Sequence, residues 1–153
     1  MKHLPYMIGI AFLGLIFWIG AIFGENEILD RLLIPGTGIT LPEWLNNFQL
    51  WTTIILASAT LMSLLWYVLG AWVFTTDDWT KVNKRSIWWL LFIPTMILSI
   101  IGCLMAQPAQ AYALLAYSFY FFNGLLCYYC ATVFTSPMPF KYIPRGAIKF
   151  RRW

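Results

Sequence analysis

The chain has 153 residues, of which 61% are hydrophobic and 10% are charged, whereas an average soluble domain carries about 25% charged residues. A soluble fold of this length cannot cover so much apolar surface, and a chain this apolar is not disordered. The composition therefore predicts an all-α integral membrane protein with a net charge of +4.

Four apolar runs are long enough to cross a membrane, for which a helix needs roughly 20 residues. They predict transmembrane helices at about residues 5–23, 48–74, 87–106 and 111–134. We expect residues 1–134 to form one domain, an antiparallel four-helix bundle, because the short connection between the last two runs favours a helical hairpin. The four runs contain no Asp, Glu, Lys, Arg or His, which argues against a proton relay or an ion pathway.

The connection between the first two runs carries two helix signals. Residues 25–34 place their leucines and isoleucines on one face and their charges on the other, which predicts a short amphipathic helix on the outer surface. Pro35 then breaks the chain. Thr40 and Glu43 match a capping box with a proline between them, so we expect the second helix to begin near Leu41, with Trp44 as an anchor at the outer membrane interface.

Lysine and arginine predict the orientation of the spans. The N-terminal tip, the loop at 75–86 and the tail at 135–153 hold nine of the ten basic residues. Since such residues concentrate on the cytoplasmic side, we expect a multi-pass inner (plasma) membrane protein with both termini in the cytoplasm. The tail also contains prolines and aromatic residues, and we expect it to bind anionic lipid or a partner, with no nucleic acid, through Lys141, Arg145, Lys149, Arg151 and Arg152.

Small and polar residues recur at spacings of three and four along the second and fourth runs. We interpret them as a stripe for helix packing or, in an oligomer, for a pore, and its members are Thr53, Thr60, Ser63, Tyr67, Gly70, Tyr120 and Asn123. Asn123 carries the most polar side chain at depth. We expect its amide to bond to another helix or to a ligand, because an unpaired amide in hydrocarbon is costly.

Cys127 and Cys130 form a CxxC motif, which supports thiol–disulfide exchange in some proteins. A four-helix membrane protein with this motif resembles the quinone-linked disulfide-forming membrane enzymes. The resemblance covers these two residues and the number of helices. It implies a membrane redox protein that uses the pair, although those enzymes carry a second cysteine pair in an outer loop and this chain has three cysteines in total.

The sequence therefore predicts a non-enzymatic subunit of the inner membrane that oligomerises or packs into a larger complex. A channel, a secretion or conjugation assembly and a sensor scaffold all fit this description. One histidine, His3, and the absence of a catalytic triad predict no catalytic site, no metal and no cofactor. The alternatives are the thiol–disulfide redox protein and an oligomeric channel or transporter for a neutral molecule.

Overall fold

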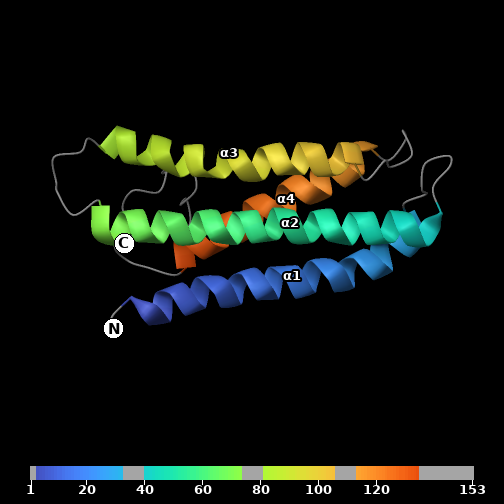
Figure 1. Cartoon of the computed structure of the whole chain (residues 1–153), viewed down its shortest axis with the longest axis horizontal. Coiled ribbons are helices and arrows are strands. Elements are labelled where there is room, and N and C mark those ends of the chain that lie inside the picture. The colour runs from blue at the N-terminus through green and yellow to red at the C-terminus, as the bar shows by residue number, and fades with distance from the viewer. Residues whose placement is uncertain (1–2, 33–39, 74–80, 106–112, 135–153) are drawn as a thin grey trace, which may run out of the picture.

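The computed structural model describes residues 3–32, 40–73, 81–105 and 113–134, and these ranges are helical almost throughout (Figure 1). The main helices are α1 (Leu4–Leu32), α2 (Leu41–Val68), α3 (Lys81–Met105) and α4 (Ala113–Phe134), and a π-helical turn, η1 (Leu69–Val73), continues α2. Three helices contain stretches long and apolar enough to cross a membrane: Leu4–Gly24, Pro42–Val68 and Ser86–Met105. The predicted all-α fold with four main helices is confirmed for the described residues, and three of the four predicted spans are long and apolar enough to cross a membrane.

The separate amphipathic helix expected at residues 25–34 is wrong, because α1 runs without interruption from Leu4 to Leu32. Gly24 weakens a helix most among the residues near the expected boundary, and one glycine costs about 1 kcal/mol without ending it. The Glu, Ile and Leu residues that follow favour the helix. With 29 residues, α1 is about 44 Å long, which exceeds the roughly 30 Å of a membrane's hydrocarbon core.

The beginning of α2 agrees with the capping signal in the sequence. The helix starts at Leu41, and Thr40 precedes it in an extended conformation. The Thr40 hydroxyl donates a hydrogen bond to Glu43 Oε2 at 2.8 Å, and the Thr40 backbone N–H lies 3.4 Å from the same oxygen. This pair fixes the first turn of α2 and, with it, the direction in which the following side chains point.

The helices α2 and α4 each pack against both α1 and α3, and Figure 1 shows α2 between α1 and α3. Side-chain contacts set the register of α1 on α2. His3 lies against Tyr67 and Trp18 lies against Thr53, so the beginning of α1 is beside the end of α2. Both α2 and α4 therefore touch each of the other three main helices.

The Trp44 ring is buried between helices, so it does not face outward as the expected interface anchor would. Its side chain is completely buried, and its ring centroid is 5.5 Å from that of Phe48. Residues four apart share one helix face, so the start of α2 at Leu41 turns both rings toward the same neighbours. They form a core cluster with Ile55 and with Tyr120 of α4.

The outward faces of α1 and α3 carry large apolar side chains. Ile8 and Phe12 on α1, and Leu90 and Ile97 on α3, are each at least half exposed. Exposed apolar surface on this scale marks contact with lipid or with another protein. The interior by contrast contains a second cluster, built on Trp66, Trp88, Phe92 and Tyr128.

Gly124 tests how closely the inner helices approach one another. A methyl group there would lie 2.9 Å from Thr95 Cγ2 and 3.1 Å from Ile55 Cγ2, so α4 must move away from its neighbours. We expect Gly124→Ala to destabilise the fold by about 1–3 kcal/mol, as overpacking does, and to lower the thermal midpoint measured by circular dichroism in mild detergent.

The matched control is Gly20→Ala, because a methyl group at Gly20 would meet no atom within 4 Å. This variant is expected to keep the midpoint or to raise it, since alanine favours a helix more than glycine does. Equal losses of stability in the two variants would contradict the packing of α4 against α2 and α3.

Candidate functional site

The threonines of the predicted stripe lie between helices and are bonded there. The Thr53 hydroxyl donates to the Gln49 carbonyl oxygen at 2.8 Å and accepts a bond from Trp18 Nε1 at 2.9 Å. The Thr60 hydroxyl donates to the Leu56 carbonyl oxygen at 2.8 Å. Bonding to the preceding turn satisfies each hydroxyl within its own helix and leaves its second contact for a neighbouring helix.

Thr60 also lies at a close approach between α1 and α2. A Cβ atom at Gly14 would lie 2.9 Å from Thr60 Cγ2, so only a glycine fits against this threonine. On its other side the Thr60 hydroxyl lies 3.8 Å from the Cys127 Sγ atom of α4. This one side chain therefore touches both α1 and α4.

Ser63, Tyr67 and Gly70 continue the stripe toward the end of α2, and all three are buried. The Ser63 hydroxyl donates to the Ala59 carbonyl oxygen at 2.8 Å and lies 3.5 Å from the Tyr128 carbonyl oxygen of α4. The Tyr67 hydroxyl is 2.9 Å from His3 Nδ1. This contact joins the beginning of α1 to the end of α2.

Tyr120, a member of the stripe on α4, contacts Phe48 of α2. Its ring stacks on that of Phe48 with centroids 4.7 Å apart, and its hydroxyl lies 3.4 Å from the Phe48 carbonyl oxygen. The side chain is 1% exposed, so it belongs to the packed interior.

The cysteine pair lies on the same helix, with both thiols free. Cys127 is completely buried beside Thr60, and Cys130 is partly buried. A buried thiol is shielded from an exchange partner, which favours a packing role for Cys127. Within the helices that the structure describes, no group of three His, Cys, Asp or Glu residues is placed to hold a metal.

The basic residues predicted for docking, Lys141, Arg145, Lys149, Arg151 and Arg152, lie outside the described residues. Their contact with lipid or with a partner stays a prediction.

A hydrogen-bonded cluster between α3 and α4 was missed by the sequence analysis. Trp88 Nε1 donates to the Thr132 hydroxyl oxygen at 3.2 Å, and the Tyr128 hydroxyl donates to the Trp88 carbonyl oxygen at 2.8 Å. The sequence analysis assigned no role to Trp88, yet its side chain is 1% exposed. Thr132 four residues after Tyr128 was the available signal, because this spacing places both on one helix face.

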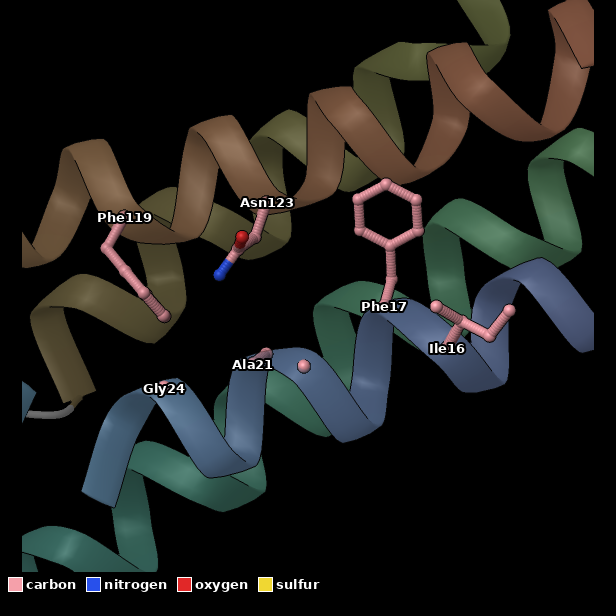
Figure 2. A pocket seen from close by; sticks show the side chains of 7 residues that line it. Ile16, Phe17, Ala21, Gly24, Phe119 and Asn123 are labelled. Atoms are coloured by element: carbon pink, nitrogen blue, oxygen red, sulfur yellow. The ribbon is translucent and has the colours of Figure 1, made fainter. Parts of the chain in front are cut away.

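Thr53 and Thr60 line a hollow of about 550 Å³ between α1 and α2. Asn123 faces a different hollow. It lies on a cavity of about 370 Å³ between α1 and α4, lined by Ile16, Phe17, Gly20, Ala21, Gly24, Phe119 and Asn123. Figure 2 shows the Asn123 amide pointing from α4 toward α1, between the side chains of Phe119 and Phe17. Its amide nitrogen is buried and has no hydrogen-bond partner among the described residues.

We expect Tyr128→Phe to destabilise the protein by about 0.5–1.5 kcal/mol, because it removes the hydroxyl that bonds α4 to the Trp88 carbonyl group. Chemical or thermal unfolding in detergent micelles measures the change. Tyr129→Phe is the control, since Tyr129 is the next residue and only partly buried. A Tyr128→Phe variant as stable as the control contradicts the role of this bond.

The double variant Cys127→Ala, Cys130→Ala tests the two interpretations of the CxxC motif. If the pair serves packing, we expect the variant to assemble normally and to support the cellular function of the chain, with a modest loss of stability from the buried Cys127 site. Complementation of a deletion strain measures the function. Normal assembly combined with lost function contradicts the packing role and favours the redox alternative.

The candidate site thus has two parts, a polar stripe bonded between helices and a cavity that holds one unpaired amide. Comparisons of the chain with protein-family models, with curated proteins and with solved structures found no match. The function is therefore argued from the contacts given above.

Proposed function

We propose that the chain is a non-enzymatic, multi-pass subunit of the inner membrane that oligomerises or packs into a larger membrane complex. In this proposal the four helices cross the membrane as an antiparallel bundle, and both termini lie in the cytoplasm. The three apolar stretches of α1, α2 and α3 support the spanning arrangement. The concentration of nine of the ten Lys and Arg residues in the tip, the second loop and the tail supports the orientation.

The observation that carries the proposal is the use of the polar stripe in packing. Thr53, Thr60 and Ser63 each bond to a carbonyl group of their own helix and also contact a neighbouring helix. A pore-lining hydroxyl turns instead toward water and the passing solute. The contacts therefore favour a subunit whose polar groups serve helix packing over a channel whose polar groups line a pore.

The surface of α1 supports contact with a further chain. Only 17% of its apolar stretch is buried, against 39% of that of α2. Its outward side chains are large and apolar, and Ile8 is 59% exposed. In a complex, such a face gains packing contacts that lipid tails supply less well.

The native mass and composition of the complex test this proposal. The full chain, tagged at its C-terminus, is extracted in mild detergent from its own membrane and weighed by native mass spectrometry. We expect additional copies or other membrane proteins at a fixed stoichiometry. A chain that is recovered alone under all mild extraction conditions contradicts the proposal.

Two isoleucine variants locate the contact. Ile8→Trp adds bulk to the exposed face of α1, and Ile97→Trp adds the same bulk to the similarly exposed face of α3. We expect Ile8→Trp to reduce the assembled fraction and Ile97→Trp to leave it unchanged. If Ile97→Trp reduces the assembled fraction and Ile8→Trp does not, the contact with the other chain lies on α3 and not on α1.

A further inference from the structure

The hollow of about 550 Å³ between α1 and α2 is bordered by exposed side chains, which include Leu15 of α1 and Ala57 and Leu61 of α2. The hydroxyl groups of Thr53 and Thr60 in its wall already donate to carbonyl groups of their own helix. The hollow therefore lacks apolar contact and does not lack a hydrogen-bond partner.

This hollow is the centre of a larger apolar surface, here called the α1–α2 face. The surface consists of two rows of side chains, one on each helix, spaced by seven and then four residues. The rows are Ile8, Leu15 and Ile19 on α1, and Leu50, Ala57 and Leu61 on α2. Such spacings keep the side chains on one side of a helix. The five large side chains among them are each at least 41% exposed.

The α1–α2 face is large enough for a stable contact between proteins. Taking about 200 Å² for a fully exposed large side chain, its five large side chains and the exposed Trp18 in the wall of the hollow offer roughly 600 Å² per copy. Two copies together would cover roughly 1,200 Å², which is the lower limit of the usual range for stable interfaces.

The direction of insertion restricts how two copies meet. Lysine and arginine orient every copy in the same way in the proposed membrane arrangement, so a two-fold axis between neighbouring copies runs along the membrane normal. Such an axis places α1 of one copy opposite α2 of the other without changing the depth of either helix. A side chain that protrudes from α1 must therefore find space on α2 at its own depth.

Leu15 and Ala57 satisfy this condition. Gly14 of α1 packs against Thr60 of α2, and the two helices run antiparallel. Leu15 follows Gly14 and Ala57 precedes Thr60 by three residues, so both are displaced from this contact in the same direction. They lie at one depth to within about one helical turn. The protruding Leu15 of one copy thus faces the small Ala57 of the other, and the symmetry repeats the contact.

A second copy fits the hollow better than acyl chains do. Lipid tails are as apolar as leucine, so contacts within the membrane depend on packing and not on the removal of water. Leu15 is held on a helix before it binds, whereas an acyl chain loses conformational freedom when it is confined in a hollow. The protruding and the small side chain both belong to this one sequence, which favours a second copy over a different protein.

We propose that the α1–α2 face binds a second copy of this chain, with Leu15 of each copy seated in the hollow of the other beside Ala57. The resulting dimer has four helices at its centre, two from each copy. This inference rests on the proposed function, since it names the partner and the contact surface of the assembled subunit.

Cross-linking between two differently tagged copies tests the contact. One copy carries Leu15→Cys and the other Ala57→Cys, in a chain whose native cysteines are replaced, and their co-expressed membranes are oxidised. A disulfide that joins both tags necessarily lies between copies. We expect this product, because the proposed dimer brings the two positions together.

The matched control pairs Leu15→Cys with Ile93→Cys on α3. Ile93 is 46% exposed, and the 3.3 Å contact between Ser58 and Thr95 places it at a depth similar to that of Ala57. We expect loss of the doubly tagged product in this control. Equal yields from the two pairs overturn the proposal, because random collision in the membrane then explains the product.

Ala57→Phe tests the same surface in the chain with its native cysteines. Ala57 is exposed in the single copy, so the substitution is expected to keep the native circular dichroism spectrum. In the dimer the added ring occupies the place of Leu15. We expect the dissociation constant, measured by energy transfer between labelled copies in liposomes, to rise by about tenfold, and to stay unchanged in Ile93→Phe. An unchanged constant in Ala57→Phe overturns the proposal.

The native mass distinguishes failure of this dimer from failure of the proposed function. Other membrane proteins at a fixed stoichiometry without a second copy overturn the dimer and leave the subunit role intact. A chain recovered alone overturns both. If that single chain retains a phospholipid that Ala57→Phe releases, the hollow holds an acyl chain. A second copy together with the expected cross-link supports both.

Discussion

The requirement that governs this structure is that lipid offers no hydrogen bonds, so each polar group at depth needs a partner within the protein. Hydroxyl groups meet it by bonding to the preceding turn of their own helix, as Thr60 and Ser63 do. The indole of Trp88 and the phenol of Tyr128 meet it across helices, whereas the buried Trp44 Nε1 has no partner among the described residues. The cross-helix bonds tie particular residues together and so specify which helix faces meet, which apolar packing alone does less strictly.

The helix α2 meets this requirement on several sides at once. Thr53 contacts α1, Ser58 lies 3.3 Å from Thr95 of α3, and Ser63 contacts α4. With these groups bonded, the surface that remains on α1 and α3 is largely apolar and suits lipid or a neighbouring chain. Asn123 is the exception in the predicted stripe, because its buried amide nitrogen has no hydrogen-bond partner among the described residues.

The helix count and the start of α2 were predictable because long apolar runs and a capping pair are local signals. The length of α1 was not, because a charged segment after Gly24 was taken as a separate surface helix although no residue there ends a helix. The burial of Trp44 and Trp88 was also missed. Tryptophan is common at membrane interfaces, and only the mutual rotation of two helices decides whether a given ring faces lipid or the interior. The cavity was beyond prediction for the same reason, since it depends on how far α1 stands from α4.

The account depends most on all four helices crossing the membrane, so the sidedness of the segments before α2 and after α4 is the direct test. In a chain whose native cysteines are replaced, Thr37→Cys and Ser136→Cys each introduce one thiol, and an impermeant maleimide is applied to intact cells and to opened membranes. The account predicts that Thr37→Cys reacts in intact cells and Ser136→Cys only after opening, because three spans separate them. Reaction of both thiols from the same side would contradict the fourth span and, with it, the placement of Asn123 within the membrane.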